Sequence, residues 1–281
     1  MMIFAGLTFA AMNIGVKLLP GIPVAEIVFF RALVSVILSY LILKRKRVPI
    51  FGKNHKILIL RGLFGTSALL LFFYTLHVLP LASAMVIHYL SPIFTALIAH
   101  IVLKERLELR QLFYFSISFI GILIMKDFDA RLSWIDLMAG VGAALLSGAA
   151  YNCIRWLKFS EDSHVIILYF PMIAVPVTLL YMAFISGWVT PNMKQLFLLL
   201  MVGVLTQIAQ YFLTRAYQSE KANKVAAISN LGIVYALLIG LWYFDEVFNP
   251  WSLIGMMLVV GGVVLNVIPS KRSKEIMTKN S

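Results

Sequence analysis

The two halves of the chain align with each other, and this internal repeat constrains the fold more than any single residue does. With a shift of 141 positions, residues 62–124 lie over residues 203–265 without a gap. The front portions align with a shift of 139 positions, which places Asn13 over Asn152. Identical residues recur at fixed points of the longer alignment, namely Gly62 with Gly203, Glu105 with Glu246 and Gly121 with Gly262. The chain is therefore predicted to contain one structural unit twice.

Both copies consist of apolar runs long enough to cross a bilayer. Hydrophobic residues make up 61% of the 281 residues and charged residues 13%, about half the charged share that is usual in soluble domains. A transmembrane helix needs about 20 apolar residues. Hydropathy predicts ten such spans, at residues 1–19, 24–43, 57–79, 81–102, 109–126, 133–154, 163–185, 194–217, 222–244 and 249–268.

Five spans in each copy make an odd number, so the second copy is predicted to be inverted in the membrane. The expected fold is an all-α integral membrane protein with ten transmembrane helices in two inverted five-helix repeats. The expected units are a first repeat at 1–130, a second repeat at 131–270 and a basic cytoplasmic tail at 271–281. Inverted repeats are how many secondary transporters build a site near the middle of the bilayer.

The basic residues gather in alternate connections between the spans. Of the 24 Lys and Arg, 19 lie in or beside one set of connections or in the tail, a group that includes Arg61. The other connections hold only Lys17, Lys126, Arg131 and Lys194. The positive-inside rule therefore predicts an inner-membrane protein with both termini in the cytoplasm. Because the formal charge of +12 follows the topology, the lipid bilayer is the expected partner and nucleic acid is not.

Two predicted spans carry polar residues near their middle, where a polar side chain survives only against protein or a water-filled cavity. Span 81–102 holds His88, Tyr89 and Ser91 before Pro92, and the shift of 141 places Ser229 and Asn230 of span 222–244 over that segment. Paired interruptions of this kind point to a transporter binding site. The alternative is a structural kink with hydrogen bonds between helices.

Further polar residues occur inside other spans. In span 194–217, Gln207, Gln210 and Thr214 form one stripe at helical spacing. The candidate substrate-binding residues are therefore Asn13, Thr66, Tyr74, His88, Tyr89, Ser91, Asn152, Gln207, Gln210, Tyr211, Ser229 and Asn230.

Arg31 is interpreted as the only basic residue well inside a span, about 10 Å from the predicted outer end. A permanently charged guanidinium at that depth needs an acidic partner, carbonyl groups or contact with the interface. Glu26, five residues away, lies on a poorly matched helical face. Two roles remain open for Arg31: a structural anchor, and a gate or contact for an anionic substrate.

No sequence pattern indicates catalysis or nucleotide hydrolysis. The chain contains no G-x-x-x-x-G-K-[S/T], no H-E-x-x-H and no G-x-S-x-G, so neither an enzyme nor a cofactor is expected. No carboxylate lies near the middle of a predicted span, which leaves exchange, uniport and proton coupling through His88 open. The small-residue run Ala139–Ala144 permits close helix packing, within the chain or in a homodimer.

The chain resembles the EamA-like members of the drug/metabolite transporter superfamily. The resemblance rests on Pro80-Leu-Ala-Ser-Ala84, Leu90-Ser-Pro92, Glu105 and Gly121 in the first copy, and on Ala216-Tyr217, Gly240, Glu246, Gly255 and Gly262 in the second. The second copy departs from the pattern at Ile233, where the first has Pro92.

This resemblance implies ten helices around a central cavity, formed by the first, third and fourth helix of each repeat. It also implies a secondary transporter that moves a small metabolite by alternating access. Amino acids, nucleosides, S-adenosylmethionine and drugs are the implied substrate range. A lipid-linked precursor flippase or a channel is the alternative.

Overall fold

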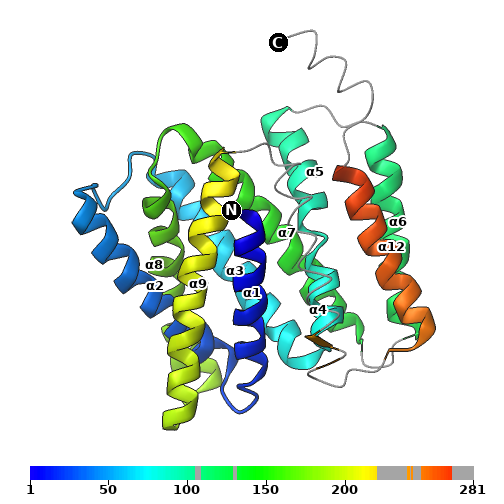
Figure 1. The fold of residues 1–281 in the computed structure, drawn as a ribbon, viewed down its shortest axis with the longest axis horizontal. Coiled ribbons are helices and arrows are strands. Elements are labelled where there is room, and N and C mark those ends of the chain that lie inside the picture. The colour runs from blue at the N-terminus through cyan, green and yellow to red at the C-terminus, as the bar shows by residue number, and fades with distance from the viewer. Residues whose placement is uncertain (105–108, 129–131, 220–238, 241, 243–247, 268–281) are drawn as a thin grey trace.

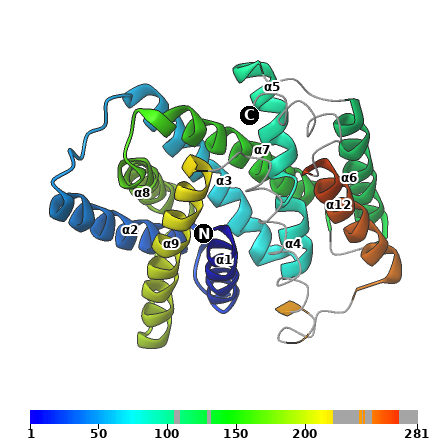
Figure 2. The same ribbon diagram turned by 45° about the horizontal axis from the view of Figure 1, so that its top comes forward.

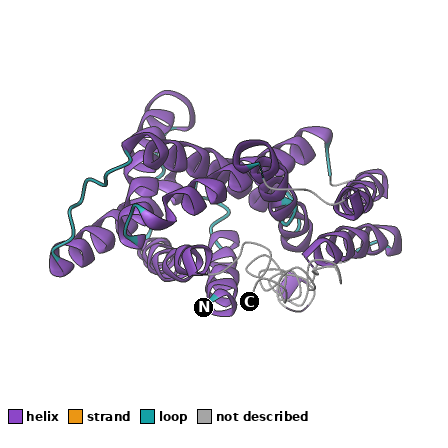
Figure 3. Cartoon of the chain, turned by 90° about the horizontal axis from the view of Figure 1, so that it is seen from above, coloured by secondary structure: helices purple, strands orange, loops and turns teal. Residues whose placement is uncertain are grey.

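The computed structural model describes residues 1–104, 109–128, 132–219, 239–240, 242 and 248–267. All regular elements in these ranges are helices (Figure 3). The α-helices are α1 (Met2–Lys17), α2 (Val24–Lys46), α3 (His55–Val78), α4 (Leu81–His88), α5 (Ser91–Leu103), α6 (Leu109–Phe128), α7 (Trp134–Trp156), α8 (Ser163–Tyr181), α9 (Met193–Ser219) and α12 (Pro250–Val267). A short 3₁₀-helix follows α7 at Leu157–Phe159, and a π-helical turn follows α8 at Met182–Ser186.

Seven segments of the described chain are long and apolar enough to cross a membrane: Val24–Lys46, His55–Val78, Leu81–Val102, Leu109–Lys126, Trp134–Phe159, Ser163–Ser186 and Met193–Ser219. Two shorter apolar helices, Met2–Lys17 and Pro250–Leu265, accompany them. The chain is thus an all-helical multi-pass membrane protein. Nine of the predicted spans have a helical counterpart in the described chain, and the predicted span at 222–244 lies almost wholly outside it.

The helices pack in a few dominant pairs (Figures 1 and 2). Helix α3 packs along α7 and α8, α1 packs along α9, and α2 packs along α8 and α9. Helices α6 and α12 form a pair at one edge of the molecule, where both views place them side by side. Buried apolar side chains form two clusters: a large one that extends through most of the helices, and a smaller one that includes Leu43, Leu58 and Tyr169.

The α6–α12 pair is held at short range by glycines. A Cβ built on Gly121 would lie 2.6 Å from the carbonyl oxygen of Gly255, and one built on Gly262 would lie 2.6 Å from the carbonyl oxygen of Tyr114. The Ser118 hydroxyl donates a hydrogen bond to the Val259 carbonyl at 3.2 Å. Small residues allow two helix backbones to approach this closely in a membrane.

The small-residue run of α7 packs within the chain. A Cβ on Gly140 would lie 2.7 Å from Cγ2 of Ile87, and one on Gly148 would lie 2.8 Å from the backbone nitrogen of Thr95. Helix α7 therefore uses its glycines to approach α4 and α5.

The interruption that the sequence predicts near Pro92 separates α4 from α5. Pro92 lies in the first turn of α5 and has no N–H to return to the preceding turn. The N–H of Tyr89 bonds the carbonyl of Met85, and the N–H of Leu90 bonds the carbonyl of Ile87. The helix therefore closes at residues 89 and 90 and restarts at Ser91.

The position of Arg61 corrects one sequence interpretation. Arg61 was assigned to the basic residues beside a connection, but its side chain is only 3% exposed inside α3. The depth is about 9 Å, because Arg61 is six residues beyond His55. Arg31 is therefore not the only buried basic residue, and the set of basic residues predicted for the cytoplasmic side is smaller by one.

Candidate functional site

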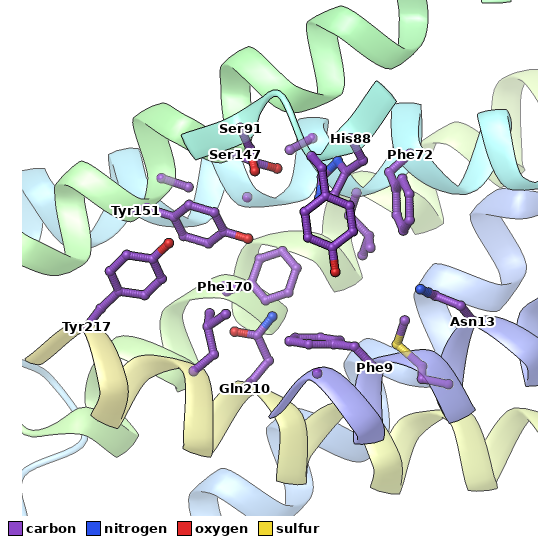
Figure 4. Close-up of a pocket in the computed structure, with 18 of the residues that line it drawn as sticks. Phe9, Asn13, Phe72, His88, Ser91, Ser147, Tyr151, Phe170, Gln210 and Tyr217 are labelled. Carbon is purple, nitrogen blue, oxygen red and sulfur yellow. The ribbon is translucent and has the colours of Figure 1, made fainter. Parts of the chain in front are cut away.

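A cavity of about 140 Å³ lies where α1, α2, α3, α7, α8, α9 and the α4–α5 break converge. Its labelled lining residues point toward one common space in Figure 4. Four lining residues lie in the break or beside it, namely His88, Tyr89, Ser91 and Pro92. The break therefore brings both polar side chains and a proline-interrupted backbone to the cavity wall.

One part of the cavity wall is cationic and aromatic. The guanidinium carbons of Arg31 and Arg61 lie 5.5 Å and 5.1 Å from the ring centroid of Phe170. Arg31 also lies 5.4 Å from the ring of Phe73. The ring of Tyr151 stacks on Tyr217 with centroids 4.9 Å apart and an interplanar angle of 18°. This part of the wall therefore contains two buried guanidinium groups and two phenol side chains.

Gly65 and Gln210 hold this region in place. A Cβ on Gly65 would overlap the Arg61 guanidinium and would lie 2.9 Å from Cδ2 of Phe170. The absence of a side chain at Gly65 therefore leaves the space that Arg61 and Phe170 occupy. Gln210 accepts a long hydrogen bond of 3.5 Å from Nη2 of Arg61, and its amide points into the cavity (Figure 4).

The other part of the wall is mostly apolar, with two polar groups. The amide nitrogen of Asn13 lies 3.1 Å from the sulfur of Met85, and the ring of His88 packs against Phe72 at an interplanar angle of 32° with centroids 4.2 Å apart. Asn13 Oδ1 and His88 Nδ1 are buried without a hydrogen-bond partner among the described residues. Because buried polar atoms are normally paired, these two atoms keep unused hydrogen-bonding capacity in residues that line the cavity.

Six of the candidate residues line the cavity: Asn13, Arg31, His88, Tyr89, Ser91 and Gln210. Ser229 and Asn230 lie outside the described residues. For these six residues, the prediction that polar side chains inside a span face a common cavity agrees with the structure.

Five other candidate residues lie away from the cavity. The Tyr74 hydroxyl donates to Asp136 at 2.9 Å, and the Asn152 amide donates to the carbonyls of Thr95 and Gly148. Gln207 donates to the Ser39 hydroxyl at 2.8 Å. Tyr211 stacks on His164 with centroids 5.2 Å apart, and Thr66 is buried with no partner for its hydroxyl among the described residues.

The sequence interpretation missed most of the aromatic wall and one of its charges. The missed lining residues include Phe9, Arg61, Phe72, Tyr151, Phe170 and Tyr217. The resemblance implied a cavity formed by the first, third and fourth helices of each repeat, yet α2 supplies Arg31 and α8 supplies Phe170. Arg61 could have been found from its depth within span 57–79.

The described residues contain no group of three or more His, Cys, Asp or Glu side chains that could hold a metal ion. An internal cavity with polar and apolar walls, set among membrane-length helices, is instead typical of a membrane transport protein. The model of the EamA-like transporter family matches residues 1–126 and again residues 133–268. The chain therefore belongs to the EamA-like transporter family.

Named transporters resemble the chain over most of its length. The pseudopaline exporter CntI of Pseudomonas aeruginosa (strain UCBPP-PA14) is 31% identical over 92% of this chain and 91% of its own. Solute carrier family 35 member G1 of Mus musculus is 30% identical over 92% of this chain and 74% of its own. The S-adenosylmethionine uptake transporter of Rickettsia prowazekii is 24% identical over 88% of this chain and 84% of its own. A solved crystal structure shares the fold, with a TM-score of 0.71. It is 14% identical in sequence, and the match covers 98% of this chain and 96% of the other.

Proposed function

We propose that the chain is a secondary transporter that carries a small metabolite across the inner membrane by alternating access. The observation that carries the proposal is the cavity enclosed between helices from both halves of the chain, with charged, amide and aromatic groups on its wall. Two of the named relatives move small molecules: one exports pseudopaline, and the other takes up S-adenosylmethionine. Neither a cofactor nor a catalytic step is part of the proposal.

Two inverted five-helix repeats are part of the same proposal, and the packing of the helices supports them. The shifts read from the sequence relate α1 to α7, α2 to α8, α3 to α9 and α6 to α12. Under this exchange, the contact of α3 with α7 becomes the contact of α9 with α1, and both occur. The contact of α2 with α9 likewise becomes that of α8 with α3, and both occur.

Individual close approaches follow the same exchange. A Cβ on Gly62 would meet Ile173, and a Cβ on Gly203 would lie 2.6 Å from Cβ of Val34. The shift of 141 relates Gly62 to Gly203, and the shift of 139 relates Val34 to Ile173.

The α6–α12 pair repeats the pattern. The approach of Gly121 to Gly255 exchanges with that of Gly262 to Tyr114, because the shift of 141 relates Gly121 to Gly262 and Tyr114 to Gly255. Each of these close contacts in one repeat thus has an equivalent contact at the positions that the two sequence shifts relate to it. This relation supports a two-fold arrangement of the repeats.

The cavity wall also contains residues that the two shifts relate. The pairs that both line it are Met12 with Tyr151, Arg31 with Phe170, Leu69 with Gln210 and Phe72 with Leu213. In inverted repeats, equivalent positions lie at mirrored depths around the middle of the bilayer. These pairs therefore support a cavity between the repeats, where rocking of one repeat against the other would expose it to each side in turn.

The proposed orientation has both termini in the cytoplasm. Without Arg61, 18 of the basic residues remain on the proposed cytoplasmic side and four on the other. Cysteines introduced at Lys46 and Lys274 should resist an impermeant thiol reagent in intact cells, whereas a cysteine at Lys194 should react. The native Cys153 is buried and provides a low background. Reaction at Lys46 without reaction at Lys194 would reverse the orientation.

Carrier activity is tested with purified full-length protein in liposomes. We expect saturable counterflow of at least one compound from a panel of amino acids, nucleosides, S-adenosylmethionine and organic acids. Flux that does not saturate would indicate a channel. No flux of any compound would contradict the carrier proposal.

A matched pair of glutamines in α9 tests whether the cavity is the binding site. Gln210 lines the cavity, whereas Gln207 bonds Ser39 on α2. Gln210→Leu should weaken the apparent affinity several-fold, since a hydrogen bond contributes about 0.5–1.5 kcal/mol. Gln207→Leu should leave the affinity unchanged. Equal effects on affinity would place the binding site elsewhere.

A further inference from the structure

We propose that the transported molecule is a small organic anion, whose carboxylate or phosphate group binds between Arg31 and Arg61 and whose apolar part lies toward Phe72 and Met85. This inference rests on the proposed carrier function and names the substrate class of its cavity. Four observations carry it: the burial of two guanidinium groups, their positions on one aromatic ring, the partners of the nearby carboxylates, and the apolar opposite wall.

Both arginines are withdrawn from water and lie on the same cavity. Arg31 is 2% exposed and Arg61 is 3% exposed. Both guanidinium carbons contact the ring of Phe170, at 5.5 Å and 5.1 Å. Their separation therefore cannot exceed the sum of these distances, 10.6 Å. Two buried positive charges thus lie within 10.6 Å of each other, where a low dielectric strengthens their mutual repulsion.

The four carboxylates whose side chains the structure describes have hydrogen-bond partners other than the two arginines. Glu26 accepts a hydrogen bond from the N–H of Val189 at 3.1 Å. Asp136 accepts from Tyr74 and Ser133. Two further carboxylates lie in the α7–α8 connection, where Glu161 accepts from the N–H groups of Lys53 and Asn54 and Asp162 accepts from that of His164.

Arg61 keeps unused hydrogen-bonding capacity within the described structure. Its Nε is buried without a partner, and its bond to Gln210 is long at 3.5 Å. A buried charge is costly unless it is paired and hydrogen-bonded. Contacts with an aromatic ring offset only part of this cost. The planar guanidinium fork matches carboxylate and phosphate oxygens, so an anionic ligand would satisfy both requirements.

The opposite wall favours an organic anion over an inorganic one. The ring of Phe72, the ring of His88 packed against it and the sulfur of Met85 form a largely apolar surface. Asn13 Oδ1 provides one unpaired acceptor there. A molecule with one anionic end and one apolar or hydroxylated end would match both walls of the cavity.

The experiment measures ligand binding to the purified full-length protein in detergent at constant ionic strength. The probes are 3-phenylpropionate as a monocarboxylate with an apolar end, glycerol phosphate as a phosphomonoester, uridine as a neutral compound and cadaverine as a cation without a carboxylate. We expect the wild-type protein to be stabilised against heat by at least one of the two anions and by neither of the other probes. Stabilisation by 3-phenylpropionate alone or by glycerol phosphate alone would identify the anionic group.

Charge-removing variants locate the binding group. Arg31→Gln and Arg61→Gln should each weaken anion binding at least tenfold, equal to about 1.4 kcal/mol. Lys56→Gln removes the same charge from the exposed start of α3 and should leave binding unchanged. In liposomes, anion flux should change with the membrane potential in the wild-type protein, a readout that needs no variant.

Three results would overturn the inference: stabilisation of the wild-type protein by uridine or cadaverine but by neither anion, unchanged anion affinity in both arginine variants, and a loss of affinity in Lys56→Gln equal to that in the arginine variants. Each would leave the carrier function intact if saturable counterflow of another compound persists. Absence of counterflow for every compound would instead contradict the carrier function itself.

Discussion

Gly262→Ala is expected to destabilise the protein, while Gly261→Ala one position earlier is expected to leave it as stable or more stable. A Cβ on Gly262 would lie 2.6 Å from the Tyr114 carbonyl oxygen and 3.0 Å from the backbone nitrogen of Ser118, and it would overlap the Ser118 hydroxyl. Backbone atoms cannot rotate away, so α12 would have to move off α6. Overpacking of this kind costs about 1–3 kcal/mol.

The control is built into the same turn of helix. A Cβ on Gly261 would meet no atom within 4 Å, and alanine is favoured over glycine in a helix by up to about 1 kcal/mol. The measurement is the midpoint of thermal unfolding of each purified variant in the same detergent. A Gly262→Ala midpoint equal to or above that of Gly261→Ala would show that the α6–α12 contact does not limit stability.

The helices could be predicted from the sequence because the bilayer leaves few alternatives. A lipid-exposed backbone must satisfy its own hydrogen bonds, so an apolar run of membrane length becomes a helix. The span predicted at 57–79 is the helix His55–Val78, and the one predicted at 133–154 is Trp134–Trp156. The break near Pro92 was predictable for a local reason, because proline removes a backbone donor.

The candidate site was predictable only in part, because a polar residue inside a span has two kinds of inward position. Asn13 and Gln210 face the cavity, whereas Asn152 and Gln207 bond neighbouring helices. Both pairs lie on helices that line the cavity, and both satisfy the rule that polar groups avoid lipid. A small rotation about the helix axis decides between the two positions, and helical spacing does not report it.

The aromatic wall was missed for a different reason. Phe9 and Phe170 line the cavity, whereas Phe113 and Phe184 are exposed on the outside of the bundle. Composition gives the same prediction for all four, since phenylalanine is compatible with both lipid and core. Arg61 was missed because it is close to the end of its span, where the positive-inside rule accounts for a basic residue without assigning it a contact.

Gly65→Ala is expected to reduce transport more than any other single-methyl change in the cavity wall, whatever the charge of the substrate. The new Cβ would overlap the Arg61 guanidinium and would lie 2.9 Å and 3.1 Å from Cδ2 and Cε2 of Phe170. Either Arg61 or the ring must leave its position, and both line the cavity. We expect the apparent affinity to fall at least tenfold, about 1.4 kcal/mol.

Gly6→Ala is the matched control for that change. Gly6 also lines the cavity, but a Cβ on it would meet no atom within 4 Å. Both substitutions add one methyl group and raise helix propensity, so both variants should reach the membrane in wild-type amounts. Counterflow kinetics of the two variants are compared at equal protein content. Equal kinetics would mean that the arrangement of Arg61 and Phe170 does not control binding, because only the Gly65 methyl group displaces them.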